Sequence, residues 1–285
     1  MDSSLSNSRQ QPDELYAPPA LDFPPRRVVS LVPSLTESLF DLGLGDRLIA
    51  ITEYCTRPAA GVLSLPRVGG TKTPNVEHII ALQPDLVLMN DEENRLEDAQ
   101  ALQAAGIPLW ITGPRTVQDA LNLLWQIMEV FDDAAMAPRV REIERAYDIT
   151  RLAAQASEPV RVFAPIWRDP WMTFNASAYA HDVLRVCGGY NVFAGSALRY
   201  PTVTLDEVVA AQPEIVLLPD EPYPFCDADI AEFSGLDIPA AHQGRIYRLD
   251  GSLLTWHGTR VAYALRDLPG LLMRGGFDDH THAHP

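Results

Sequence analysis

The chain has 285 residues, a mass of 31.5 kDa and a formal net charge of −16, from 38 acidic and 22 basic residues. This length suits two lobes of ordinary domain size better than one large core. The acidic balance repels nucleic acid and anionic membrane surfaces, which argues against a nucleic-acid-binding role. The three cysteines cannot all pair and show no C-x-x-C spacing, which favours buried thiols over a disulfide framework or a zinc ribbon.

The two ends of the chain are interpreted as lying outside the fold. Residues 1–26 lack a basic start and an apolar core, so they indicate a disordered leader rather than a signal peptide. With no long apolar run elsewhere, the sequence as given is typical of a cytoplasmic protein. The tail at 276–285 holds His280, His282 and His284 at alternate positions, which could hold a divalent metal, or it is a disordered end with incidental metal affinity.

The first strand is predicted at residues 28–32, which are apolar and β-branched. Ser34 and Glu37 follow with the spacing of a capping box, so a helix is expected to begin there. Its free amides would favour a polar ligand group at the carboxyl edge of the sheet. Further strands are expected at 47–52, 86–89 and 107–112, and helices at 95–105 and 117–131. This alternation predicts a parallel sheet with helices on both faces.

One stretch of the chain is repeated. Residues 77–92, EHIIALQPDLVLMNDE, return as residues 206–221, DEVVAAQPEIVLLPDE, at an offset of 129. Each copy has the pattern of a short helix, a Gln-Pro stop and a buried strand. A second echo precedes each copy, VVSLVP at 28–33 and VRVFAP at 160–165. The repeat therefore predicts two similar lobes.

The alternation breaks at residues 137–156, which lack glycine and are rich in Arg, Glu and Ala. They predict one helix of about 30 Å that connects the lobes, since a flexible linker would be rich in Gly, Ser or Pro. In the second lobe a helix is expected at 179–186, a strand at 245–249 and a closing helix at 256–273. The predicted domains are a leader at 1–26, an N-terminal lobe at 27–132, a linking helix at 133–157, a C-terminal lobe at 158–275 and a tail at 276–285.

No catalytic motif stands out, because the chain has no G-x-S-x-G, H-E-x-x-H or P-loop pattern. His181 and Asp182 are interpreted as a surface pair rather than half of a catalytic dyad. This favours a binding protein over an enzyme. Aromatic side chains offer the stronger signal, because several fall where predicted strands end, the edge at which ligands bind in doubly wound sheets. Large aromatic faces suit a flat, bulky, partly apolar ligand, although each one alone is as consistent with capping a loop.

An ordered set of phrases carries a resemblance to a known family. They are VVSLVPSLTE at 28–37, the Tyr54-x-x-x-Pro58 loop, VGGT at 68–71 with PNVE at 74–77, LQPDLVL at 82–88 and VCGGYNVF at 186–193. Together they resemble the class III substrate-binding proteins of ABC transporters, which carry cobalamin, haem and iron-siderophores, and especially their cobalamin-binding branch. The resemblance implies an α/β fold of two Rossmann-like parallel-sheet lobes joined by a single long α-helix.

The resemblance also implies a monomer without a cofactor of its own, which binds cobalamin or another corrinoid between the lobes and docks on an ABC transporter permease. Haem or a ferric siderophore is the alternative ligand, and a cytoplasmic corrinoid- or metal-handling protein is the alternative role. The family role would place the chain outside the inner membrane, in the periplasm. The candidate ligand-binding residues are Ser34, Tyr54, Thr71, Lys72, Asn90, Trp167, Trp171, Tyr200, Tyr223 and Trp256.

The family's permease-docking carboxylates match Glu77 in the first lobe and Asp206 or Glu207 in the second. Some family positions differ here. Tryptophans that line the family's cobalamin site fall on Thr71 and Asn90, and a polar pair falls on Ser252 and Thr255. Tryptophans elsewhere could restore the apolar area: Trp167, Trp171 and Trp256.

Overall fold

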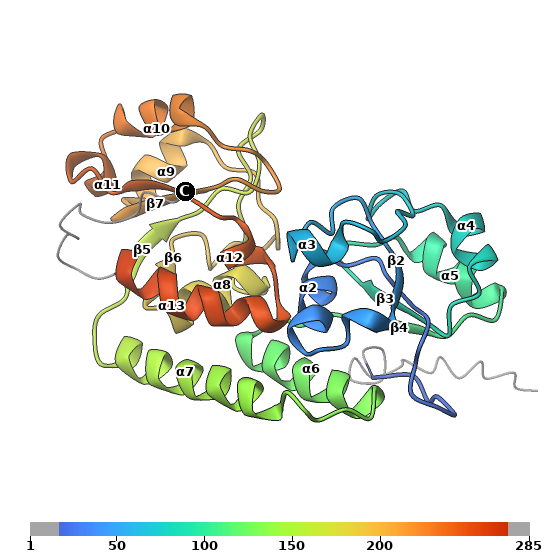
Figure 1. Cartoon of the computed structure of the whole chain (residues 1–285). Helices are drawn as coiled ribbons and strands as arrows, with labels where there is room; N and C mark the ends of the chain where they lie inside the picture. Colours follow the sequence, from blue (N-terminus) through green and yellow to red (C-terminus); the bar gives the residue numbers. More distant parts are fainter. Residues whose placement is uncertain (1–16, 273–285) are drawn as a thin grey trace, which may run out of the picture. The chain divides into compact units, whose positions relative to one another are not determined.

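The computed structural model describes residues 17–272 and divides the chain into two compact units (Figure 1). Unit 1 holds the described residues up to Gly113 together with Leu124–Ala137. Unit 2 holds Pro114–Leu123 and the described residues from Pro138 onward. Each unit is built around its own parallel sheet.

The sheet of unit 1 has the strand order β2-β1-β3-β4. Its strands are β1 (Val28–Ser30), β2 (Leu48–Ile51), β3 (Leu86–Asn90) and β4 (Leu109–Thr112). Its helices are α2 (Pro33–Asp41), η1 (Gly45–Arg47), α3 (Ala59–Val62), α4 (Val76–Ala81) and α5 (Leu96–Ala104). Every residue of β3 is buried, as a near-continuous apolar run in a parallel sheet predicts. Val29, Val87 and Met89 share one apolar core with Ile79 of α4.

The sheet of unit 2 repeats this topology with the order β6-β5-β7-β8. Its strands are β5 (Val160–Phe163), β6 (Gly189–Asn191), β7 (Ile215–Pro219) and β8 (Ile246–Leu249). Its helices are α8 (Tyr179–Val186), α9 (Leu205–Ala211), α10 (Asp227–Ser234), α11 (Pro239–His242), α12 (Ser252–Thr255), η2 (Gly258–Arg260) and α13 (Val261–Leu271). Two parallel sheets with matching strand order confirm the predicted α/β class with two similar lobes.

Two further helices lie between these sheets in the sequence, α6 (Val117–Val130) and α7 (Ala137–Gln155). The long helix predicted at residues 137–156 is confirmed as α7, and all of it after Ala137 belongs to unit 2. Helix α6 begins in unit 2 and ends in unit 1.

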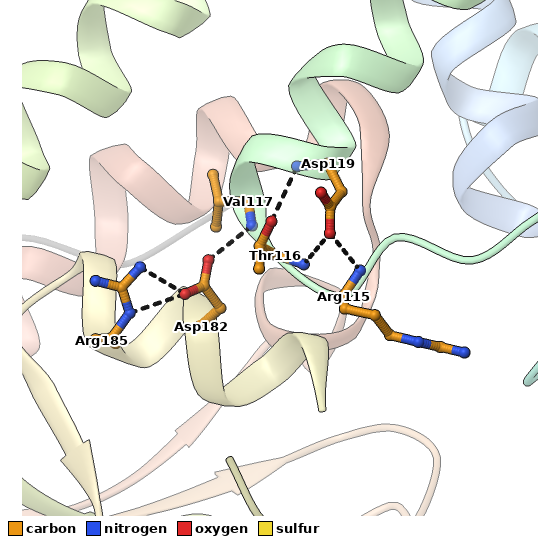
Figure 2. A network of polar contacts seen from close by, with 6 residues as sticks. All are labelled: Arg115, Thr116, Val117, Asp119, Asp182 and Arg185. Carbon is orange, nitrogen blue, oxygen red and sulfur yellow. Dashed lines mark hydrogen bonds and ion pairs between the residues drawn. The ribbon is translucent and has the colours of Figure 1, made fainter. Parts of the chain in front are cut away.

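The first turn of α6 is held by Asp182 of α8 (Figure 2). One oxygen of Asp182 accepts from the backbone N–H of Val117 at 2.8 Å, and the other accepts from Arg185 at 2.8 and 2.6 Å. Because Asp182 is only 6% exposed, the interpretation of His181 and Asp182 as a surface pair is wrong for Asp182. A carboxylate at a helix N-terminus satisfies free amides and complements the helix dipole.

The same turn is also closed locally. Asp119 accepts from the backbone N–H groups of Arg115 and Thr116 at 3.0 and 2.9 Å, and its own N–H donates to the Thr116 hydroxyl at 3.0 Å (Figure 2). Reciprocal bonds of this kind define a capping box. The start of α6 is therefore fixed from within and from α8.

The repeat is confirmed in the backbone. Gln83 and Gln212 both adopt the left-handed conformation, with φ of 48° and 47°, and each precedes a proline. A left-handed residue ends a helix, and the following proline cannot continue it. The Gln-Pro stop in the sequence is thus a true helix terminus in both units.

Two expectations about helix starts are wrong. Helix α2 begins at Pro33, so Ser34 lies inside the first turn, and the N-cap is Val32, which makes no side-chain cap bond. Proline is favoured at the first helical position, which moves the start one residue upstream of the expected capping box. The closing helix does not start at Trp256, which ends α12 in an extended conformation. Gly258 then has φ of 78°, which interrupts the helix before α13.

Candidate functional site

A partly exposed aromatic pair lies at the carboxyl edge of the sheet in unit 2. Trp167 is carried by a hairpin that follows β5, in which Met172 donates to the Trp167 carbonyl at 3.1 Å. Tyr223 lies in the loop after β7, and its ring meets Trp167 edge to face at 5.5 Å. Trp167 is 45% exposed and Tyr223 is half-buried. The pair therefore offers aromatic surface beyond what the core uses.

Trp171, in the same hairpin, packs inward instead. It stacks on Phe225 with ring centroids 5.8 Å apart and meets Phe233 edge to face at 5.0 Å. The guanidinium of Arg168 lies 5.1 Å from the Trp171 ring and pairs with two carboxylates of α10, one of them Glu232 at 2.6 Å. The ring contacts of Trp171 and the ion pairs of Arg168 attach the hairpin to α10, and they thereby fix the position of Trp167.

Tyr200 belongs to a segment that runs beside this hairpin. The backbone N–H of Thr173 donates to the carbonyl oxygen of Pro201 at 3.0 Å, and the backbone N–H of Val203 donates to the carbonyl oxygen of Trp171 at 2.9 Å. Tyr200 is 39% exposed. The structure thus brings Trp167, Trp171 and Tyr200 into one antiparallel unit beyond the end of β5.

The loops after β7 and β8 add polar groups. The Thr255 hydroxyl donates to Glu221 at 3.2 Å, and the Gly251 amide donates to Asp220 at 2.7 Å. Burial raises the pKa of the Glu221 carboxyl. Trp256 itself is buried, with the Arg260 guanidinium 5.6 Å from its ring. Sequence reasoning missed Glu221, although it is the last residue of the repeat.

In unit 1 the loop after β2 presents Tyr54, which is 61% exposed. Arg67 holds both sides of that loop, donating to the carbonyls of Thr52 at 2.7 Å and Cys55 at 2.8 Å. The buried Cys55 thiol also lies 3.1 Å from the Thr36 hydroxyl, and burial raises its pKa. An exposed ring on a loop fixed at both sides is a pre-organised contact surface.

The other candidates of unit 1 contribute to its internal structure. Asn90 is buried and accepts from the amides of Glu92 and Glu93 at 2.9 and 3.2 Å. Lys72 donates to the Glu92 carbonyl at 2.5 Å. The Thr71 carbonyl accepts from the Asn94 side chain at 3.0 Å. Thr71, Lys72 and Asn90 are thus brought together in one loop network, while Ser34 is buried in the first turn of α2.

The candidate docking carboxylates occupy matching helical positions. Glu77 is the second residue of α4 and Asp206 the second residue of α9, and both are exposed. Glu207 accepts instead from the Thr204 amide and hydroxyl at 2.7 and 3.0 Å, which completes a capping box. Glu77 and Asp206 are therefore the exposed carboxylates at equivalent positions of the two units.

Within residues 17–272 no group of His, Cys, Asp and Glu side chains is arranged to hold a metal ion. The candidate metal ligands His280, His282 and His284 lie outside the described residues. None of the helices in the described part of the chain is long and apolar enough to cross a membrane.

A family model described as periplasmic binding protein matches residues 28–253, and the chain belongs to that family. The resemblance found in the sequence is thereby confirmed. The chain is 34% identical to a vitamin B12-binding protein of Vibrio parahaemolyticus serotype O3:K6 over 196 residues, which cover 68% of this chain and 70% of that protein. It is 31% identical to a vitamin B12-binding protein of Yersinia pestis (strain Pestoides F) over 193 residues, which cover 67% and 69%.

Solved structures agree on the fold. The chain is similar to the periplasmic vitamin B12 binding protein BtuF of Vibrio cholerae, with a TM-score of 0.74, 25% identity and coverage of 87% of this chain and 97% of that one. It is also similar to the periplasmic heme-binding protein RhuT from Roseiflexus sp. RS-1, with a TM-score of 0.73, 25% identity and coverage of 86% and 97%. Proteins with this fold thus include one named for vitamin B12 and one named for heme.

Proposed function

We propose that the chain is the substrate-binding protein of an ABC transporter, that it binds a corrinoid such as cobalamin, and that it catalyses no reaction. The observation that carries the ligand class is the partly exposed aromatic pair of Trp167 and Tyr223 at a sheet edge, in a chain whose sequence relatives are vitamin B12-binding proteins. Corrinoids are flat, bulky and partly apolar, and aromatic faces bind such ligands by stacking.

Each unit supports the proposal by itself. In unit 2, Trp167, Tyr223 and Tyr200 offer exposed ring surface beyond the carboxyl ends of the strands. In unit 1, Tyr54 offers the same from the loop after β2. We assign contact with the macrocycle to these four side chains, and to Trp171 the support of Trp167.

Haem is the second candidate ligand, favoured by the similarity to the heme-binding protein RhuT. A ferric siderophore is a third, because it too is a bulky iron chelate. These ligands differ in their edge groups, since haem carries two carboxylates whereas cobalamin carries amides. The polar groups beside the aromatic pair would then decide between them.

The transporter role requires docking on a permease and a position outside the inner membrane. The exposed carboxylates Glu77 and Asp206, at the same position of two equivalent helices, are the proposed docking groups. Exposed carboxylates of this kind would pair with basic side chains of the permease, which favours specific encounter.

Calorimetric titration with cyanocobalamin tests the proposal, with haemin and a ferric siderophore as competitors. We expect saturable binding of cyanocobalamin and a higher melting temperature in its presence, since a ligand that binds the native state stabilises it. No heat and no thermal shift at high micromolar cyanocobalamin would contradict the proposal, and binding of haemin alone would establish the second candidate.

A further inference from the structure

A carboxyl group lies beside the aromatic pair of unit 2. Glu221 follows the end of β7 by two residues and precedes Tyr223 by two, in the loop that brings Tyr223 to 5.5 Å from Trp167. On its other side, the Thr255 hydroxyl at the end of α12 donates to Glu221 at 3.2 Å. Because β5, β7 and β8 are adjacent and parallel, these groups follow one another along one sheet edge.

The position of Glu221 is fixed by close packing of the loops after β7 and β8. Pro219 and Leu249 are paired at the ends of these strands, and the Gly251 amide donates to Asp220 at 2.7 Å. A Cβ atom at residue 251 would lie 2.6 Å from both the Cγ and the carbonyl oxygen of Glu221, so only glycine fits there. The Glu221 side chain therefore emerges from a tightly held loop.

The surroundings of Glu221 oppose its charge. Burial raises the pKa of its carboxyl most, and the carboxylates of Asp250 and Asp220 raise it further. Hydrogen bonds from the neutral Thr255 hydroxyl and Trp256 indole act in the opposite direction. A half-buried carboxylate kept among other carboxylates destabilises the free protein, and such groups gather at functional sites.

We propose that Glu221 is a specificity-determining residue of the corrinoid site, whose carboxylate accepts hydrogen bonds from the primary amide N–H groups at the rim of the macrocycle. This inference rests on the proposed function. Trp167 and Tyr223 cover the ring, while Glu221 recognises its edge. The carboxylates of haem offer no N–H donor and are repelled by Glu221, Asp220 and Asp250, so the same group selects against haem.

The test is calorimetric titration of the wild-type chain, Glu221→Gln and the control Asp227→Asn with cyanocobalamin at pH 7.5 and at pH 4, which lies below the ordinary pKa of a glutamate. Asp227 is an exposed residue of α10. Protonation removes the acceptor charge, so wild-type affinity is lost as pH falls through the raised pKa of the free protein. We expect Glu221→Gln to bind about tenfold more weakly at pH 7.5, without this pH dependence, because charge-assisted hydrogen bonds are the stronger kind. Asp227→Asn should behave as wild type.

A second ligand tests the role of the Glu221 carboxyl in the wild-type chain, where no substitution can disturb the fold. The heptamethyl ester of dicyanocobyrinic acid keeps the corrin ring but lacks amide N–H donors, so its affinity for the wild-type chain should be equal at both pH values. Equal cyanocobalamin affinity of wild type and Glu221→Gln, or a wild-type affinity for cyanocobalamin that does not change with pH, would overturn the inference. If the wild-type chain binds neither corrinoid, the proposed function itself fails.

Discussion

Arg27 and Arg161 make the same hydrogen bonds in the two units. Arg27 donates to the carbonyl oxygen of Gln83 at 3.3 Å and to that of the preceding residue at 2.6 Å. Arg161 donates to Gln212 at 3.3 Å and to the residue before it at 2.5 Å. The last carbonyls of a helix have no partner within it. Arg27, just before β1, and Arg161, in β5, therefore each close the end of a repeat helix.

We expect Arg27→Ala and Arg161→Ala each to lower the free energy of unfolding by roughly 1 kcal/mol, because the lost hydrogen bonds lie at the surface. The two residues share no partner, so the double variant should lose the sum. Urea unfolding measures both effects. An unchanged midpoint in either single variant would show that water replaces the arginine without loss.

Asp182 offers a stronger test of helix capping. Asp182→Ala should destabilise the chain by about 1–3 kcal/mol, because it leaves the buried Val117 amide without its partner. Asp182→Asn keeps an acceptor oxygen and should lose less. Urea or thermal unfolding would distinguish the two, and equal stability of wild type and Asp182→Ala would show that this contact is not needed to hold α6.

Tyr54 should affect the ligand and not the fold. We expect Tyr54→Ala to weaken cyanocobalamin binding by about 1 kcal/mol, or roughly fivefold, because aromatic contacts contribute on that scale. The melting temperature should not change, since the ring is 61% exposed. Tyr54→Phe keeps the ring and serves as the control. A loss of affinity in Tyr54→Phe equal to that in Tyr54→Ala would assign the effect to the hydroxyl.

The docking carboxylates should separate transport from binding. We expect Glu77→Lys combined with Asp206→Lys to leave cyanocobalamin affinity unchanged and to abolish uptake through the cognate permease, because the new charges repel basic groups. Uptake by membrane vesicles containing that permease measures the effect. Glu207→Gln is the control, because Glu207 caps α9. Its loss should affect stability rather than docking. Unaffected uptake in the double variant would contradict the docking role.

The raised pKa of Glu221 also makes the stability of the folded chain depend on pH. Its pKa in the folded chain is raised above the usual value, so the stability associated with its protonated form is present at acid pH and is lost as pH rises through the folded-state pKa. Glu221→Gln removes this loss, and we expect it to raise the melting temperature of the ligand-free chain at pH 7.5 more than at pH 4. A melting temperature that is lowered equally at both pH values would contradict this.

Local patterns predicted most of the fold because they act over a few residues. The apolar run of β3, the Gln-Pro stop at Gln83 and the absence of glycine in α7 each determine structure within one element. The repeat then extended each assignment to the second lobe. The expected start of α2 failed for a local reason too, because Pro33 and Ser34 compete for the same helix terminus.

The candidate site was harder to predict because its contacts join distant parts of the chain. Trp167 and Trp171 lie in one hairpin, yet only Trp171 stacks on Phe225, a residue far along the sequence. Glu221 meets Thr255 in the same way, across 34 residues. A single sequence indicates that aromatic residues gather at strand ends, but it does not indicate which of them turn outward.

Helix α6 determines whether the chain can be cut into two fragments that each hold one whole unit. Its first residues belong to unit 2 and its last to unit 1, so neither unit is one uninterrupted stretch of sequence. A single protease cut near residue 113 or near residue 137 would leave one fragment without part of its own unit. We therefore expect that separately expressed halves will fold poorly alone and recover structure when mixed, whichever of these two places is chosen for the division.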